Sequence, residues 1–236
     1  MKNCIRLILA LAILCPALST ATLAADNAYL YLVQGIPGRD FSAATDPEFP
    51  VDILINGDVC YQRGLTYGTI AGPLTLAPGN YEVAVSVADS LLPCSNSPFT
   101  DSTVSLEAGK NVSAVVALSQ TGSPTLLTFG NKFSPVTATM GRVLFAQAAD
   151  SPGVEVILQN RTTTKVYTYA VNPGALLDVT LPAGGYDVEI NQGTTTLVAS
   201  TSVELYSQSV LELYAVGQAS NQSVDLESKT VRNVIP

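Results

Sequence analysis

The sequence predicts an all-β protein built from two tandem Ig-like antiparallel β-sandwich domains. Apolar and polar residues alternate along most of the chain, as half-buried strands require, and helical periodicity is nearly absent. Turn-forming residues interrupt the alternation at the short intervals typical of sandwiches and barrels. The block LTLAPGNYEVAV, which begins at Leu74, returns 105 residues later as VTLPAGGYDVEI.

Each alternating run of the first half predicts one strand. The dipeptide Asn56-Gly57 is a strong hairpin signal, because both residues tolerate the positive φ that a tight turn requires. Clusters of Pro, Gly, Asn and Ser mark the other turns. The predicted strands cover residues 28–33, 51–55, 65–70, 81–87, 103–106, 112–118 and 125–129.

The second half repeats blocks of the first half in the same order. Besides the block already quoted, strand-like segments begin near residues 141, 154, 166 and 209. Matched blocks in one order indicate duplication of a whole domain rather than a short solenoid repeat. We therefore expect a first domain over 28–130, a linker over 131–140, a second domain over 141–228 and a C-terminal tail over 229–236.

The repeated block predicts a folding device that is used twice. A leucine ends one strand, a Pro/Ala/Gly turn follows, and Tyr81 or Tyr186 begins the next strand. We expect each ring at the edge of the core with its hydroxyl bonded to the turn backbone, as in the tyrosine corner of Ig-type sandwiches. The repeat therefore predicts structure rather than two active sites.

Residues 1–24 have the features of a secretory signal peptide. Lys2 and Arg6 precede a short apolar run that ends in small residues. Lipidation at Cys15 is the alternative, but a leucine stands before this cysteine where a lipoprotein signal has a small residue. We expect an exported protein, periplasmic or extracellular, and no later apolar run reaches the length of a transmembrane segment.

The net charge limits the classes of partner, and the cysteine count predicts a disulfide. Loss of the leader would leave nine basic and 19 acidic residues, a net charge of −10, which argues against nucleic acid and anionic membranes. Cys60 and Cys94 would remain, and an oxidising compartment favours a disulfide between them. A two-thiolate metal site is the alternative, but the chain has no histidine to complete it.

The absence of histidine also excludes Ser-His-Asp and Cys-His catalysis. We therefore expect no catalytic residue, no metal and no cofactor. The carboxylates of Asp40, Asp46, Glu48 and Asp52 are close in sequence, which leaves a calcium loop or a glycosidase pair as alternatives to a solvated acidic loop. Because Asp52 alternates with core-facing neighbours, we expect it to face solvent.

Two loops of the first half are longer than their counterparts in the second half. They cover residues 35–50 and 89–101. Elaborated loops on a rigid scaffold often carry binding, although surface loops also tolerate insertions without function. The tentative binding residues lie in the first of these loops and are Arg39, Asp40, Phe41, Asp46, Glu48 and Phe49.

Several blocks resemble the bacterial exported domain-of-unknown-function family 4397. In the first half these are PVDILING (50–57), LTYGT (65–69), LAPGNY (76–81) and LEAGKN (106–111). The second half matches more weakly, through VEV (154–156) and LPAGGY (181–186). The resemblance implies two tandem copies after a signal peptide. It brings no catalytic residue, and a histidine that the family usually has near its first strand is missing here.

These observations favour a non-enzymatic binding or structural module of the cell envelope, whose partner is an unknown protein or glycan. A carbohydrate-binding or assembly-accessory protein is the alternative, because Tyr29 and Tyr31, and likewise Tyr167 and Tyr169, share one strand face and could stack on sugar rings. Packing within the sheets is the other explanation for these tyrosines. A hydrolase that uses carboxylates is the remote alternative.

Overall fold

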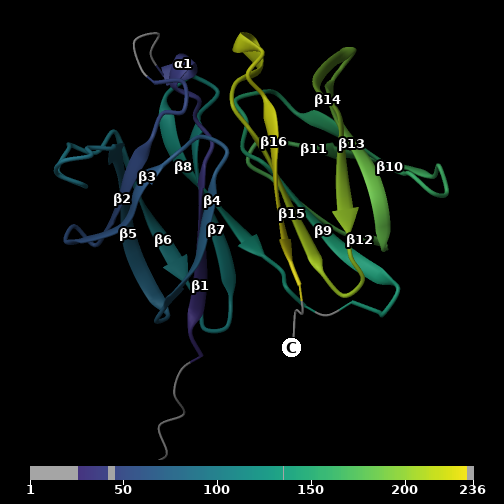
Figure 1. Cartoon of the computed structure of the whole chain (residues 1–236), viewed down its shortest axis with the longest axis horizontal. Helices are drawn as coiled ribbons and strands as arrows, with labels where there is room; N and C mark the ends of the chain where they lie inside the picture. Colours follow the sequence, from purple (N-terminus) through teal and green to yellow (C-terminus); the bar gives the residue numbers. More distant parts are fainter. Residues whose placement is uncertain (1–25, 42–45, 135, 233–236) are drawn as a thin grey trace, which may run out of the picture.

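A computed structural model describes residues 26–41, 46–134 and 136–232, and the predicted signal peptide lies outside them. Within these ranges, sixteen strands form four sheets of four strands each. The sheets lie in four layers, with the first sandwich on the left and the second on the right of Figure 1. The predicted all-β fold with two sandwich units is confirmed. None of the described helices is long and apolar enough to span a membrane.

The first sandwich contains β1 to β8 and one short helix, α1 (Gly38–Phe41). Its inner sheet has the order β4-β1-β7-β8, and its outer sheet has the order β3-β2-β5-β6. The strands are β1 (Ala28–Gln34), β2 (Val51–Ile55), β3 (Val59–Leu65), β4 (Ile70–Leu76), β5 (Gly79–Val87), β6 (Thr100–Leu106), β7 (Asn111–Leu118) and β8 (Pro124–Asn131).

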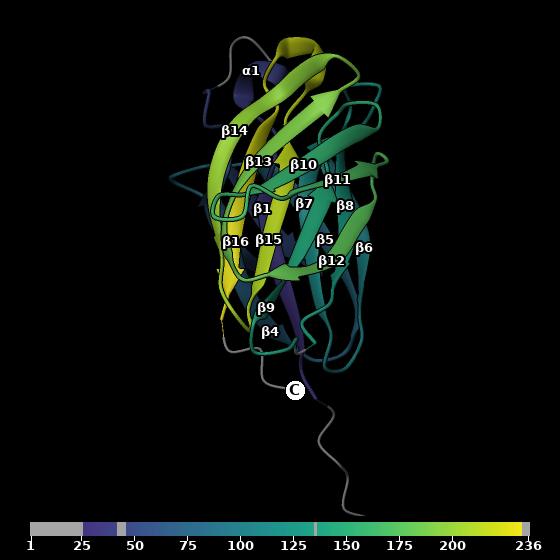
Figure 2. The ribbon, with the colours of Figure 1, turned by 90° about the vertical axis from the view of Figure 1, so that its right-hand side faces the viewer.

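The second sandwich repeats this arrangement with β9 to β16. Its inner sheet has the order β12-β9-β15-β16, and β11-β10-β13-β14 forms the outer layer that faces the viewer in Figure 2. The strands are β9 (Met140–Gln147), β10 (Val154–Asn160), β11 (Val166–Val171), β12 (Leu176–Pro182), β13 (Gly184–Gln192), β14 (Thr195–Leu205), β15 (Val210–Val216) and β16 (Asp225–Val231), with a 3₁₀ turn, η1 (Ala219–Asn221), before β16.

Two features of the strand arrangement differ from the sequence-based expectation. Each inner sheet contains one parallel pair, β1 with β7 and β9 with β15, so the sheets are mixed rather than wholly antiparallel. After β1 the chain passes through β2 and β3 of the outer sheet, β4 of the inner sheet, and β5 and β6 of the outer sheet. It then returns to the inner sheet as β7, which runs parallel to β1. Strand β16 also continues to Val231, beyond residue 228, where the second domain is expected to end.

The predicted strand over 65–70 is wrong. Strand β3 ends at Leu65, and the chain turns before β4 begins at Ile70. Gly68 has a φ of 74°, and the Thr69 amide donates to the Thr66 carbonyl at 3.1 Å. Alternation continued through this segment in the sequence, but a glycine in the left-handed region closes a turn instead. The Asn56-Gly57 hairpin is confirmed, with φ of 54° and 76°.

The repeated tyrosines lie at equivalent positions in the two sandwiches. The Tyr81 hydroxyl donates to the Ala77 carbonyl at 2.8 Å, and the Tyr186 hydroxyl donates to the Pro182 carbonyl at 2.7 Å. Each bond therefore ties the start of a core strand to the end of the strand before it. Tyr186 is fully buried, whereas Tyr81 is half-buried.

We expect Tyr186→Phe to lower the free energy of unfolding by about 1 kcal/mol, because the ring stays in the core and only a buried hydroxyl bond is lost. Urea unfolding would measure the change. Tyr81→Phe is the matched comparison and should cost less, since Tyr81 is only half-buried and its hydrogen bond is exposed to water. Equal costs would show that burial does not set the value of this bond.

The inner sheets of the two sandwiches pack against each other. Their facing side chains form a third apolar cluster between the two domain cores. Gly35 makes this close approach possible, because a Cβ there would lie 2.8 Å from both the Val116 carbonyl oxygen and the Val216 Cγ1. The Gly217 amide donates to the Gly35 carbonyl at 3.0 Å. The buried members of the cluster are Val33, Val115, Ala117, Phe129, Ala146, Ala148, Tyr214 and Val216.

A buried polar group crosses the same interface. Glu212 of the second sandwich is 1% exposed, and its Oε1 accepts from the Asn131 side-chain amide at 2.6 Å. The Tyr214 hydroxyl donates to the same oxygen at 3.1 Å and lies 2.7 Å from the Ser113 hydroxyl. Burial raises the pKa of Glu212 to about 7. These bonds and the apolar cluster hold the two sandwiches in one arrangement.

Candidate functional site

The segment between β5 and β6 distinguishes the first sandwich from the second. It runs over residues 88–99 and lies against the outer sheet, which faces away from the second sandwich (Figure 1). The equivalent strands of the second sandwich, β13 and β14, are joined by the two-residue turn Gly193-Thr194. We call residues 88–99 the stapled loop, because a disulfide and a buried carboxylate fix it.

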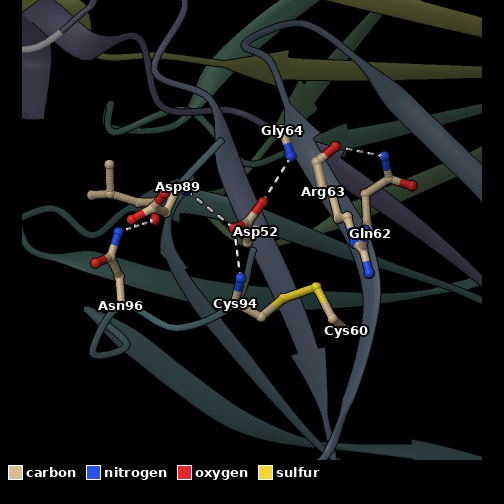
Figure 3. The surroundings of a disulfide bond; sticks show 9 residues. Asp52, Cys60, Gln62, Arg63, Gly64, Asp89, Cys94 and Asn96 are labelled. Atoms are coloured by element: carbon tan, nitrogen blue, oxygen red, sulfur yellow. Dashed lines mark hydrogen bonds between the residues drawn. A yellow bond between two sulfur atoms is a disulfide. The ribbon is translucent and has the colours of Figure 1, made fainter. Parts of the chain in front are cut away.

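The predicted disulfide between Cys60 and Cys94 is confirmed. Cys60 lies on β3 and Cys94 lies in the stapled loop, with 5.9 Å between their Cα atoms and a sequence separation of 34. The bond therefore joins the loop to the edge strand of the outer sheet (Figure 3).

Asp52 is the second anchor of the stapled loop. Its Oδ2 accepts from the backbone amides of Cys94 at 2.8 Å and Asp89 at 3.3 Å, and its Oδ1 accepts from the Gly64 amide at 2.8 Å (Figure 3). The expectation that Asp52 faces solvent is wrong, since it is 1% exposed. Its side chain does point to the outer face, but the loop covers that face.

The position of Asp52 in the second sandwich provides a natural comparison. Glu155 follows Val154 on β10 as Asp52 follows Val51 on β2, and Glu155 is exposed. It lies opposite Asn191, close to the short turn, whereas Asp52 lies opposite Ser86, beneath the stapled loop. The carboxylate is therefore buried only where the loop is present.

We expect Asp52→Asn to lower the free energy of unfolding by about 2 kcal/mol, because an amide has one acceptor oxygen where the carboxylate uses two to bind three amides. Hydrogen exchange at the Cys94 amide should also accelerate. Glu155→Gln is the matched control and should change neither quantity. Unchanged exchange at Cys94 in Asp52→Asn would contradict the anchoring role.

Hydrogen bonds between residues that are close in sequence shape the tip of the loop. The Asp89 carboxylate accepts from the amides of Leu91 at 2.8 Å and Leu92 at 3.0 Å, and these backbone bonds lower its pKa. The Ser95 amide donates to the Leu92 carbonyl at 3.2 Å, and the Asn96 side-chain amide donates to the Val87 carbonyl at 2.9 Å. The loop is thus bonded internally as well as to the sheet.

Two leucines stand at this tip and face water. The Leu91 side chain is 88% exposed and Leu92 is 66% exposed, more than any other large hydrophobic residue in the described part of the chain. A single exposed leucine is ordinary on a protein surface, but adjacent leucines on a firmly held loop form an apolar projection. A projection of this kind can enter a pocket on another molecule.

The tentative binding loop over 35–50 has another place in the structure. Asp40 bonds to the Ser223 hydroxyl, and it accepts from the Asn221 side-chain amide at 3.0 Å, so it connects the first sandwich to the second. Phe49 is 1% exposed, and its ring lies 5.6 Å from that of Phe99.

The other tentative binding residues are spread along this segment. Arg39 has a largely exposed side chain, and Phe41 is the last residue of α1. Asp46 and Glu48 are exposed, and the Glu48 amide donates to Asp46 at 2.9 Å. Residues 42–45 lie outside the described residues. Of the six tentative binding residues, Asp40 therefore supports the domain interface and Phe49 the core.

The carboxylates that are close in sequence do not meet in space as a site. Asp52 bonds to the stapled loop, while Asp40 bonds to the second sandwich. Among the described residues, no group of three or more acidic or cysteine side chains is arranged to hold a metal ion.

The tyrosine pairs pack rather than form a flat platform. Tyr31 is 3% exposed, lies 5.9 Å from the Phe133 ring and has the Lys229 ammonium 4.6 Å from its centroid. Tyr167 and Tyr169 pack against the core of the second sandwich. These rings contribute to the interface and the core, as sheet packing predicts.

Sequence reasoning did not identify Asp52, Leu91 and Leu92 as members of one site. A signal was present, because a disulfide between β3 and Cys94 must draw the loop across the face on which Asp52 lies. The exposure of the two leucines has no such signal, since leucine in a sequence normally predicts core.

One protein-family model matches more than half of the chain. The model of the domain of unknown function DUF4397 matches residues 28–157, which covers the first sandwich and extends into β10. No curated protein matches the chain.

Solved structures give remote likenesses only. A leucine-rich repeat protein from Bacteroides thetaiotaomicron is 13% identical, with a TM-score of 0.23 over 82% of this chain and 26% of its own. The Bacillus anthracis TIE protein is 12% identical, with a TM-score of 0.29 over 82% and 34%. A candidate cell adhesion protein from Bacteroides ovatus is 8% identical, with a TM-score of 0.30 over 90% and 99%. The chain thus spans about a quarter to a third of the first two, and all three TM-scores lie below 0.5.

Proposed function

Because the chain belongs to the DUF4397 family, whose function is unknown, we propose a role from its geometry: an exported, non-enzymatic binding module of the cell envelope. One observation carries the proposal. The first sandwich holds the stapled loop by a disulfide and a buried carboxylate, and the second sandwich has a two-residue turn in its place. A loop that only tolerated insertion would need no such anchors.

The double sandwich supplies a rigid base for this loop. The apolar cluster and the Glu212 bonds fix the second sandwich against the inner sheet of the first, so the outer sheet and its loop face the other way. Binding residues placed on loops of a rigid scaffold are a common arrangement in β-sandwich proteins. The disulfide suits an oxidising compartment, which supports an exported location.

The proposal is tested with the purified protein on an array of glycans and cell-envelope fractions. In the test variant, residues 88–97 are replaced by Gly-Thr, the turn of the second sandwich, and Cys60 is changed to Ser. Loop 35–50 is left intact, because its Asp40 and Phe49 support the interface and the core. A matched control changes Gly193-Thr194 to Asn-Gly.

Binding by the native protein and the control, with loss in the test variant, is the expected result. Binding to a glycan would select the carbohydrate-binding form of the module, and binding to protein fractions the assembly form. Retained binding in a folded test variant would show that the stapled loop is not the binding element.

A further inference from the structure

The tip of the stapled loop is organised before any partner arrives. Asp89 binds the amides of both leucines, Asp52 binds the amides of Asp89 and Cys94, and the disulfide closes the other side. Ordering a flexible loop opposes binding, and a loop that is already ordered avoids most of this cost. Leu91 and Leu92 are therefore presented in a fixed arrangement.

The sequence around the tip carries mostly negative charge, and the nearest basic residue before it, Arg63 on β3, stands beside the disulfide (Figure 3). No lysine or arginine occurs between Gly64 and Gly109, whereas Glu82, Asp89, Asp101 and Glu107 lie in this stretch. Asp89 stands directly beside the leucines, and as an aspartate it is ionised at neutral pH; the backbone bonds lower its pKa further. A partner must therefore offer an apolar surface to the two leucines and a positive charge to the Asp89 carboxylate.

Resting on the function proposed above, we propose that Leu91 and Leu92 insert into an apolar pocket of a partner protein whose rim carries lysine or arginine. The pocket would bury the two side chains, and a basic group at its edge would pair with the Asp89 carboxylate. Apolar anchors in a desolvated centre with charged groups at the rim are the usual anatomy of protein recognition.

A lipid bilayer fits these observations less well. Two leucine side chains are less apolar than one myristoyl chain, whose membrane binding is already marginal. The anion at the base of the tip would be repelled by acidic headgroups and would have to be desolvated on insertion.

Photocrosslinking in the native cell envelope tests the proposal. A benzophenone amino acid replaces Ser90, which is exposed and adjacent to the tip, so both leucines remain. The matched control carries the same group at Thr194, in the exposed turn of the second sandwich. The adduct is identified by mass spectrometry, including the crosslinked residues of the partner.

The expected result is a protein adduct from position 90 and not from position 194. Its crosslinked residues lie in an apolar pocket with lysine or arginine at the rim. Adding Leu92→Asp to the position-90 protein should lower the adduct yield about tenfold or more, because it buries an unpaired carboxylate. About 0.5 M NaCl should also lower the yield by screening the rim pair.

Several results would overturn the proposal. These are equal yields from positions 90 and 194, a yield that Leu92→Asp leaves unchanged, an adduct with lipid, or an adduct with a second copy of this chain. An unfolding curve for Leu92→Asp that matches the native one shows that the substitution leaves the fold intact. The two proposals can fail separately. If binding on the array depends on the stapled loop but the adduct contains lipid, the chain is still a binding module, and only the insertion into a protein pocket is rejected.

Discussion

Replacing Cys60 and Cys94 by alanine is expected to lower the free energy of unfolding by about 4 kcal/mol. The disulfide closes a loop with a sequence separation of 34, and the chain-entropy model assigns a value of this size to such a loop. Urea unfolding of the native and double-alanine proteins would measure the difference. The change should act mainly through the unfolded chain, which the disulfide no longer restricts.

The same double substitution also has an expected local effect. Without the disulfide, the Cys94 segment is held by Asp52 alone, so the amide of residue 94 should exchange with solvent faster. A loss below about 1 kcal/mol together with unchanged exchange at residue 94 would show that Asp52 is a sufficient anchor.

Stability is expected to fall as pH rises from about 4.5 to 7, and Glu212 is one cause. Burial raises its folded-state pKa to about 7 from the ordinary value of 4.5. The folded protein therefore holds a proton that the unfolded chain releases, so this stability is fully present below pH 4.5 and is lost as pH passes through the folded pKa. The shift corresponds to about 3 kcal/mol.

Glu212→Gln isolates this contribution. Glutamine can still accept from Asn131 and Tyr214 but does not ionise, so the variant should exceed the native protein in stability at pH 8 and match it near pH 4.5. Urea midpoints across this range would measure the difference, with Glu107→Gln, an exposed glutamate, as control. Parallel profiles for native and Glu212→Gln proteins would contradict the assignment.

Other ionisable groups near Glu212 are present in both proteins and cancel in the comparison. Tyr214 lies beside it on β15, Lys229 lies opposite it on β16, and Tyr31 faces it from β1 of the first sandwich. Glu227 on β16 also has a pKa raised to about 7 by burial and by Asp225. Its contribution remains in the Glu212→Gln variant, which is why the difference rather than the native slope is informative.

Alternation and turn residues were enough to predict the fold class and most strands. The core faces of β2 and β10 follow directly from Val51, Ile53 and Ile55 and from their repeats. Prediction failed at 65–70, because local alternation does not reveal a glycine in the left-handed region. The segment forms the turn between β3 and β4 instead of a strand.

The interface between the sandwiches was beyond sequence reasoning. Val33, Val115 and Val216 lie on inner-sheet strands whose two faces are both buried, so their alternation does not show which face meets the other sandwich. Glu212 is a charged residue in a strand, which normally indicates solvent. Only the packing of two sheets turns it into a buried group with partners from both sandwiches.

The candidate site was predicted in part. The disulfide followed from the cysteine count and the expected compartment, and residues 89–101 were recognised as an elaboration of the first sandwich. Asp52 was assigned to solvent because strand periodicity describes which face a residue points to and not what covers that face. The exposure of Leu91 and Leu92 depends on the path of the covering loop.

The proposed function requires the stapled loop to hold its two leucines in a fixed arrangement. Backbone amide order parameters of Leu91 and Leu92, measured by ¹⁵N relaxation on the oxidised protein, test this requirement directly. We expect values of about 0.85, equal to those of the flanking strands β5 and β6. Values below about 0.6 in the oxidised protein would show a mobile tip and would contradict the account.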